Sequence, residues 1–172
     1  MPLRILTGNL ITMSTDAIVN AANSELLEGG GVCGAIFSST HREKLTEACR
    51  QVAPCPTGKA VITPSFGLKS PHIIHAVGPI WKDGSHDEKE LLERAYLSAL
   101  ELAYEKDLHS IAFPLLSCGI YGYPKEEGMT VAISTILTFL EHHEMEVYLV
   151  LLEEDLTEMA TNIQLEIKKE RS

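Results

Sequence analysis

The fold is decided by the stretch Asn20-Ala-Ala-Asn23-Ser-Glu-Leu-Leu-Glu-Gly29-Gly30-Gly31-Val32-Cys33-Gly34-Ala35-Ile36. This stretch runs from the end of an apolar strand through a polar loop into three glycines and the start of a helix. Consecutive glycines let backbone N–H groups approach an anion, and a helix start adds unpaired donors and a partial positive charge. The stretch therefore predicts a phosphate-binding loop, with a nucleotide-like diphosphate as the ligand.

A second glycine loop, Ser117-Cys118-Gly119-Ile120-Tyr121-Gly122, supports this interpretation. It lies between an apolar strand at 111–113 and a predicted helix that begins at Pro124. Ligands of open α/β sheets bind there, outside the carboxyl ends of the strands. Either loop alone is also typical of an ordinary strand-to-helix turn, but two such loops can hold one pyrophosphate between them.

Short apolar runs alternate along the chain with segments of helical periodicity, which predicts a central sheet covered by helices on both faces. Strands are predicted at Leu3–Thr7, Ala17–Ala21, Lys59–Thr63, His72–Val77, Ser110–Phe113 and Val147–Leu152. Helices are predicted at about 32–38, 42–52, 85–106, 124–140 and 156–169, the third of them opened by a capping box from Ser85 to Glu88. We expect one domain spanning residues 1–172.

Composition bounds the location and the partners. The chain has 172 residues, is 45% hydrophobic, and contains no apolar run near the ~20 residues that cross a bilayer, so we expect a cytoplasmic protein with no membrane partner. A net charge of −10, with the 14 Lys and Arg forming no basic stripe, argues against DNA as a partner. The four cysteines form no C-x-x-C pair, which predicts buried, reduced thiols and no metal site.

Two other nucleotide-binding patterns fit less well. Gly29, Gly31 and Gly34 satisfy the spacing of the dinucleotide-binding fingerprint, but the segment Asn23–Glu28 intervenes between the preceding strand and these glycines, so a nicotinamide oxidoreductase is the weakest alternative. The segment Thr57-Gly58-Lys59-Ala60 lacks the first glycine of a P-loop and the hydroxyl that would hold magnesium.

Several long motifs, in order along the chain, resemble the macro domain family, whose members bind ADP-ribose and in many cases hydrolyse ADP-ribosyl esters. The motifs are Gly8-Asn-Leu-Ile-Thr12, Ala17-Ile-Val-Asn-Ala-Ala-Asn23, Gly29-Gly-Gly-Val-Cys-Gly-Ala-Ile36, Pro56-Thr-Gly-Lys-Ala60, His75-Ala-Val-Gly-Pro79 and Ile111-Ala-Phe-Pro-Leu-Leu-Ser-Cys-Gly-Ile-Tyr-Gly122. The resemblance implies a three-layer α/β/α sandwich with a mixed, mostly parallel sheet, and it implies no cofactor. It is closest to the bacterial branch associated with O-acetyl-ADP-ribose deacetylation and with removal of mono-ADP-ribose from acidic side chains.

The same resemblance implies where the ligand lies. Adenine is expected against Asn9 and Leu10, with Leu152 also in contact, and the distal ribose near the carboxamide of Asn23. The diphosphate is expected between two sets of residues, which are Gly29, Gly30, Gly31, Val32 and Cys33 on one side and Ser117, Cys118, Gly119, Ile120 and Tyr121 on the other.

Four polar side chains in these motifs also have structural interpretations. The amide of Asn23 can both donate to and accept from a ribose, or it can hold its own loop by bonding backbone groups. Tyr121 either caps the distal ribose or packs against its neighbours. We expect Asn20 to be structural and His75 to be a satisfied core histidine.

Three positions depart from the family pattern. Asn9 and Leu152 stand where many members have an Asp and an aromatic ring, which weakens the preference for adenine. Cys33 stands where hydrolases of the family place an Asp proposed to act as the base. A free thiol is mostly protonated at neutral pH, and no histidine is evidently paired with Cys33 in the sequence, so we expect the substrate's phosphate to assist the reaction.

Asn23 and Cys33 are therefore the candidate catalytic residues, and two functions stay open. The first is an ADP-ribosyl-ester hydrolase that acts on O-acetyl-ADP-ribose or on ADP-ribosylated protein. The second is a reader that binds ADP-ribose or ADP-ribosylated protein without turnover, which the absence of an acid at position 33 favours.

Overall fold

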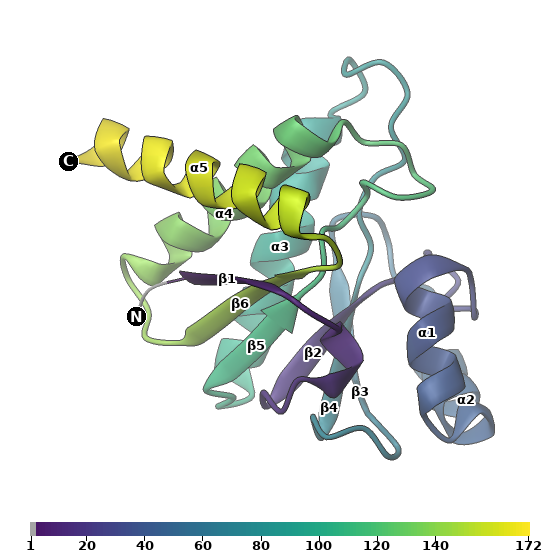
Figure 1. The fold of residues 1–172 in the computed structure, drawn as a ribbon. Coiled ribbons are helices and arrows are strands. Elements are labelled where there is room, and N and C mark those ends of the chain that lie inside the picture. The colour runs from purple at the N-terminus through teal and green to yellow at the C-terminus, as the bar shows by residue number, and fades with distance from the viewer. Residues whose placement is uncertain (1–2) are drawn as a thin grey trace.

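The computed structural model describes residues 3–172 and contains one six-stranded sheet (Figure 1). The strands are β1 (Leu3–Thr7), β2 (Ala17–Ala21), β3 (Ala60–Pro64), β4 (His72–Ala76), β5 (Ser110–Phe113) and β6 (Glu146–Leu151). They are ordered β1-β6-β5-β2-β4-β3, and every neighbouring pair is parallel except β3 and β4. The prediction of a mixed, mostly parallel sheet is confirmed.

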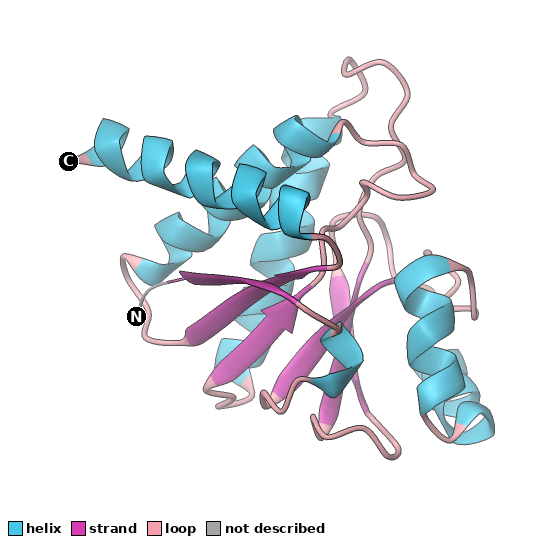
Figure 2. Ribbon diagram, viewed as in Figure 1, coloured by secondary structure: helices cyan, strands magenta, loops and turns pink. Residues whose placement is uncertain are grey.

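Helices cover both faces of this sheet (Figures 1 and 2). They are the 3-10 helix η1 (Leu10–Thr12) and the α-helices α1 (Gly31–Ser39), α2 (Arg42–Val52), α3 (Glu88–Glu105), α4 (Lys125–Leu140) and α5 (Glu154–Arg171). The apolar residues of α3, α4 and α5 pack in one core, and those of η1, α1 and α2 pack in a second core on the opposite face. The predicted three-layer α/β/α sandwich is confirmed.

The central strands β2, β4 and β5 are mainly apolar on both sides because both sides are covered. In β2, Val19 contacts the core under α3 and α4, whereas its neighbour Ile18 contacts the core under α1 and α2. Successive side chains of a strand point to opposite faces, so a strand buried twice has no polar face. Asn20 in β2 and His75 in β4 are buried polar residues and are register partners on adjacent strands.

The helix boundaries correct one prediction. Ser85 does not cap α3, which begins at Glu88 after Asp87 in a left-handed conformation with φ of 60°. The left-handed residue redirects the chain, so Ser85 lies outside the helix and the Glu88 carboxylate bonds the preceding loop instead. The capping box is therefore wrong, although α3 itself is present.

The last helix is longer than its sequence pattern suggests. It continues to Arg171, whose guanidinium lies 3.2 Å from Glu141 and 3.0 Å from Thr138 of α4 and its C-terminal turn. These contacts between helices hold residues that would fray in an isolated helix.

The parallel strands bring their carboxyl ends to one edge of the sheet. Beyond those ends, the Gly8 N–H donates to the Leu151 carbonyl at 2.8 Å, and the Ala22 N–H donates to the Ala76 carbonyl at 3.0 Å. The segments that follow β1, β6, β5, β2 and β4 therefore meet at this edge, and they include both glycine loops.

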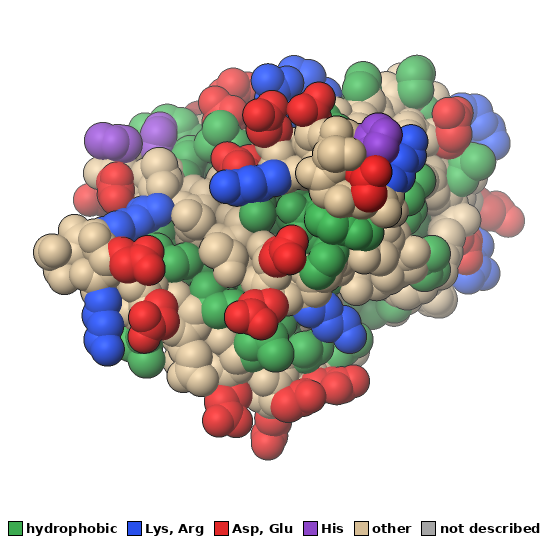
Figure 3. All heavy atoms as spheres, turned by 90° about the horizontal axis from the view of Figure 1, so that it is seen from above, with side chains coloured by type: hydrophobic (Ala, Val, Ile, Leu, Met, Phe, Trp, Pro, Cys, Tyr) green, Lys and Arg blue, Asp and Glu red, His purple; other side chains and the backbone are tan. Residues whose placement is uncertain are grey.

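Charged side chains of both signs are interspersed on the face seen in Figure 3, where basic groups are separated by acidic ones. Within residues 3–172, none of the helices combines the length and the apolar character that crossing a membrane requires. The four cysteines are free and buried, as predicted.

Candidate functional site

A cavity of about 260 Å³ lies between the two glycine loops at the carboxyl edge of the sheet. Its walls come from the end of β2 and the loop after it, the N-terminus of α1, the second residue after β4 and the loop after β5. The lining residues are Ala21, Ala22, Asn23, Gly29, Gly30, Gly31, Val32, Cys33, Gly78, Leu115, Leu116, Ser117, Gly119, Ile120 and Tyr121. Ten of the fourteen sequence-predicted site residues line this cavity. The other four, Asn9, Leu10, Cys118 and Leu152, are not among its lining residues.

The first glycine loop ends directly in α1. Gly30 is the N-cap of this helix, and Gly31 begins it with a φ of 57° that favours glycine. A Cβ at Gly34 would lie 2.6 Å from the carbonyl oxygen of Gly29, so the helix start and the loop approach too closely for any side chain. The first N–H groups of a helix have no partner in a preceding turn, and here they point to the cavity end of α1 as donors for an anion.

The carboxamide of Asn23 closes its own loop. Its Oδ1 accepts a hydrogen bond from the Leu27 N–H at 3.0 Å, and its Nδ2 donates to the Leu27 carbonyl at 2.9 Å. The structural role considered from the sequence is therefore present. A carboxamide has a second N–H and further lone pairs, so Asn23, which lines the cavity, can still contact a ribose.

Cys33 is buried at the start of α1, with 5% of its surface exposed. Its thiol donates toward the Leu27 carbonyl, with Sγ 3.6 Å from the oxygen, and lies 3.7 Å from the Nδ2 donor of Asn20. The thiol is thus held between a backbone acceptor and a side-chain donor, which gives it a packing role at the base of the first loop.

Behind Cys33, Asn20 and His75 form a buried polar network. The Asn20 amide nitrogen lies 3.1 Å from His75 Nδ1, and Thr63 Oγ1 lies 2.9 Å from His75 Nε2. Burial lowers the pKa of His75 to about 4, so the imidazole is neutral at physiological pH. Asn20 thus lies between His75 and Cys33. Both ring nitrogens of His75 have partners, which confirms the prediction of a satisfied core histidine. The amide nitrogen of Asn20 holds the network, but its buried Oδ1 has no hydrogen-bond partner among the described residues.

The second glycine loop is a closed turn. The Tyr123 N–H donates to the Ser117 carbonyl at 2.9 Å, and the Gly122 N–H donates to the Gly119 carbonyl at 3.0 Å. Ser117 has a φ of 66°, and its buried Oγ has no hydrogen-bond partner among the described residues. A buried hydroxyl without a partner is costly, so this oxygen is available to a polar group in the cavity.

Ile120 and Cys118 point in opposite directions from this loop. Ile120 is 84% exposed, and its Cδ1 lies 3.2 Å from where a Cβ on Gly30 would be, so it bridges the two glycine loops. Cys118 is buried in the core against Gly128 of α4, and burial raises the pKa of its thiol to about 12. Only the backbone of Cys118 can take part in the site, because its side chain faces away from the cavity.

The residues expected at adenine lie outside the cavity. Asn9 caps η1 by accepting a hydrogen bond from the Ile11 N–H at 3.1 Å, and Leu10 is buried in the core beneath it. Leu152 follows β6 and is 75% exposed. Since β1 and β6 are adjacent, Asn9 and Leu152 stand beside each other on the same edge as the cavity.

Five lining residues were not expected from the sequence: Ala21, Ala22, Gly78, Leu115 and Leu116. Gly78 is the most informative, because a Cβ there would collide with the Ser117 Oγ. The sequence feature that could have indicated Gly78 is its position directly after a predicted apolar strand, in the motif His75-Ala-Val-Gly-Pro79. Among the residues that line the cavity, Cys33 and Tyr121 are the titratable ones.

The profile of the Macro domain family matches residues 19–132. An O-acetyl-ADP-ribose deacetylase from Escherichia fergusonii is 43% identical over 159 residues, which cover 89% of each chain. The Oceanobacillus iheyensis macrodomain with MES bound superposes with a TM-score of 0.93 at 39% identity, covering 98% of this chain and 93% of the other. The Trypanosoma brucei macrodomain in complex with ADP-ribose superposes with a TM-score of 0.85 at 32% identity, covering 93% and 68%.

Proposed function

The chain belongs to the macro domain family, and on this premise we propose that it binds ADP-ribose and hydrolyses ADP-ribosyl esters. The substrates we propose are O-acetyl-ADP-ribose and mono-ADP-ribose on acidic side chains of proteins. The observation that carries the proposal is the cavity between the two glycine loops, which combines backbone donors, a helix N-terminus and the Asn23 carboxamide.

The charge of the protein supports recognition at close range. A net charge of −10 repels a diphosphate at a distance, but this field is screened beyond a Debye length of ~8 Å at physiological salt. Backbone N–H groups of the two loops can bind the anion directly, without a cationic side chain. The distal ribose then lies at Asn23, and adenine lies toward Asn9 and Leu152.

Two features support hydrolysis by a substrate-assisted route. The Cys33 proton is directed to the Leu27 carbonyl, and the neutral His75 does not contact the thiol, so neither is placed to act as a base. In the proposed step, the oxygen of a water bonds either the distal ribose carbon or the acyl carbon, and the bond from that carbon to the bridging ester oxygen breaks. The bridging oxygen keeps the electron pair and leaves as part of a carboxylate in the first case or of a ribose alkoxide in the second. The water proton passes to a diphosphate oxygen, from which it can return to the alkoxide, and loop N–H groups stabilise the developing charge.

A reader without turnover is the second candidate. It is favoured by the cavity lining, which holds no carboxylate and no histidine. Loss of a positioned base typically lowers the rate ~10²–10⁴-fold. The protein is a hydrolase if substrate positioning and electrostatic stabilisation still give measurable turnover, and a reader if they do not.

The test measures binding and turnover on the same preparation. We expect ADP-ribose to bind with a dissociation constant between about 1 μM and 1 mM by calorimetry, and AMP to bind much more weakly. Single-turnover hydrolysis of a peptide carrying mono-ADP-ribosylated glutamate then separates the two candidates. Binding with turnover supports the hydrolase, binding without turnover supports the reader, and equal affinity for AMP and ADP-ribose contradicts a diphosphate site between the loops.

A further inference from the structure

The second glycine loop is contacted from outside the cavity by the segment that follows β4. The Trp81 N–H donates to the Tyr121 carbonyl at 2.8 Å. The indole of Trp81 also packs edge-on against the Tyr123 ring, with 4.8 Å between the centroids. Residues on both sides of Gly122 are therefore held by one tryptophan.

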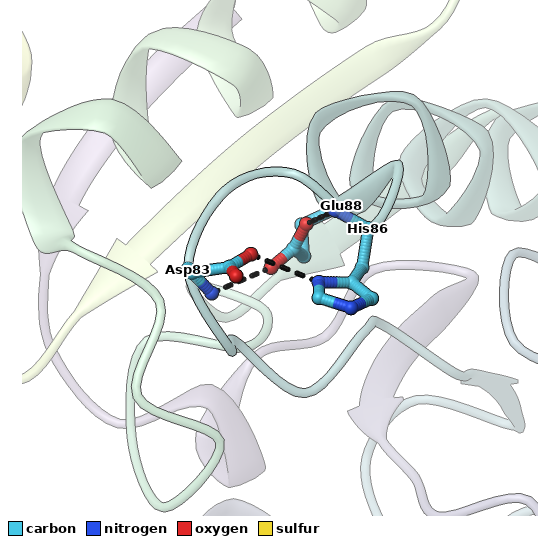
Figure 4. A group of neighbouring side chains, drawn as sticks. All are labelled: Asp83, His86 and Glu88. Carbon is cyan, nitrogen blue, oxygen red and sulfur yellow. Dashed lines mark hydrogen bonds and ion pairs between the residues drawn. The ribbon is translucent and has the colours of Figure 1, made fainter.

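The segment after Trp81 is in turn held by the carboxylate of Glu88 (Figure 4). Glu88 Oε2 accepts hydrogen bonds from the N–H groups of Lys82 at 3.1 Å, Asp83 at 3.2 Å and Gly84 at 2.9 Å. Glu88 Oε1 accepts one from the N–H of His86 at 2.6 Å. Only 1% of the Glu88 surface is exposed, so one buried side chain closes the whole loop 82–86.

The charge of this carboxylate is maintained by its contacts. Burial raises the pKa of Glu88, but the hydrogen bonds from the loop N–H groups outweigh that effect and lower it to about 2. Hydrogen bonds to a charged acceptor are roughly twice as strong as those between neutral groups. A neutral acceptor of the same shape cannot therefore replace it.

The neighbouring polar groups are already paired. Asp83, His86 and Glu88 offer oxygen and nitrogen atoms that lie within 4.8 Å of one another, which is a spacing that metals use. However, both Glu88 oxygens accept loop N–H groups, and Asp83 Oδ1 accepts from Ser85 and lies 2.8 Å from His86 Nδ1. These three side chains therefore close loop 82–86, and we assign no metal ion to them.

The hydrogen bond from Trp81 fixes one peptide unit of the second glycine loop. The Tyr121 carbonyl and the Gly122 N–H belong to one planar peptide unit. The carbonyl accepts from Trp81, and the N–H donates to the Gly119 carbonyl, so both ends of this plane are fixed. Fixing the plane fixes the turn 119–122, and with it the direction of the backbone N–H groups of Gly119, Ile120 and Tyr121, which line the cavity.

We propose that Glu88 is a positioning residue for the diphosphate: it holds loop 82–86, which holds Trp81, which orients the turn 119–122. Glu88 is not among the residues that line the cavity, and its effect on ADP-ribose binding rests on the proposed function. The arrangement of the turn itself does not depend on that function.

The test replaces Glu88 by Gln. A carboxamide puts an NH₂ group against at least one of the four N–H donors, so the loop loses hydrogen bonds while the side chain keeps its size. We expect the dissociation constant for ADP-ribose to rise about tenfold, because small displacements of positioning groups are costly. In the unliganded protein, the backbone amide NMR signals of Gly119, Ile120, Tyr121 and Gly122 should shift, while those of the first glycine loop stay in place.

Two controls separate positioning from general destabilisation. Glu90→Gln makes the same change on the exposed side of α3 and should leave affinity and signals unchanged. Ile136→Val removes one methyl group from the core under α4, and it should lower stability without lowering affinity. If Glu88→Gln does not fold, Glu88→Asp keeps the charge but shortens the reach, and it should give the same shifts with a smaller loss of affinity.

The outcomes are distinguishable from those for the proposed function. If the wild type does not bind ADP-ribose, the proposed function fails, and the amide signals of the turn 119–122 still decide the role of Glu88. Unchanged signals in Glu88→Gln and in Glu88→Asp would overturn the proposal. So would an equal loss of affinity in Ile136→Val at matched stability.

Discussion

The diphosphate end and the adenine end of the proposed site differ in what they offer a ligand. The diphosphate end consists of backbone groups on two glycine loops. The Asn20–His75 network lies buried behind the first glycine loop, and loop 82–86, held by Glu88, lies behind the second. The adenine end offers two exposed side chains, Asn9 and Leu152. Backbone held by buried contacts tolerates little change, whereas an exposed side chain can be replaced with a small loss of stability. We therefore expect the departures from the family pattern at Asn9 and Leu152 to affect the site less than changes at the diphosphate end.

The largest expected effect concerns the network behind the first loop. An unperturbed histidine has a pKa of 6.5, and burial lowers that of His75 to about 4, so only the unfolded chain takes up a proton between these values. The contribution of the neutral imidazole to the free energy of unfolding is fully present above pH 6.5. We expect the free energy of unfolding to fall by about 3 kcal/mol as the pH decreases from 6.5 to about 4. Denaturant unfolding at several pH values measures the slope.

His75→Gln should remove most of this slope, and His142→Gln, which alters an exposed histidine, should not. An unchanged slope in His75→Gln would show that the buried imidazole is not the group that titrates. The pH dependence would then not distinguish the diphosphate end from the adenine end.

The next effect separates catalysis from binding at Asn23. Asn23→Ala removes the two hydrogen bonds to Leu27 and the group proposed to orient the distal ribose. We expect single-turnover ester hydrolysis to fall ~10²-fold, because a small misplacement near the reacting carbon has that cost. Asn162→Ala on the exposed surface of α5 is the matched control. A loss below about threefold would reduce Asn23 to the structural role alone.

A smaller effect is expected at the adenine end. Leu152→Phe supplies the ring that many family members have, and it should tighten ADP-ribose binding by about 0.5–1.5 kcal/mol. Calorimetry measures the change, with Leu165→Phe, at an exposed position on α5, as the control. Unchanged or weaker binding would mean that position 152 does not contact adenine or has no room for a ring.

The smallest effect is expected for Cys33. Since its thiol packs between Asn20 and Leu27, Cys33→Ala should change the hydrolysis rate by less than about threefold, against ~10²-fold or more for a base or nucleophile. Cys55→Ala, in the same core but outside the cavity, controls for loss of a buried thiol. A collapse of the rate with ADP-ribose binding intact would identify the thiol as catalytic.

The secondary structure was largely predictable from local sequence. Apolar runs such as Ala17–Ala21 and Ser110–Phe113 are strands in the structure with the predicted bounds, because burial on both faces leaves a continuous apolar signal. Both glycine loops were also visible, since glycine at Gly31 permits a backbone conformation that other residues rarely adopt. The resemblance of the motifs to the macro domain family added the expectation of a mixed, mostly parallel sheet.

The partners of individual side chains were decided only by the tertiary structure. Ser85 and Glu88 have the spacing of a capping box, yet Asp87 turns the chain and Glu88 bonds the loop beside the site. Cys33 meets Asn20, and through it His75, because β2 and β4 are adjacent in the sheet and α1 packs on that face. Periodicity reports the burial of each element along the chain, whereas contacts between elements depend on strand order and helix packing, which no single stretch encodes.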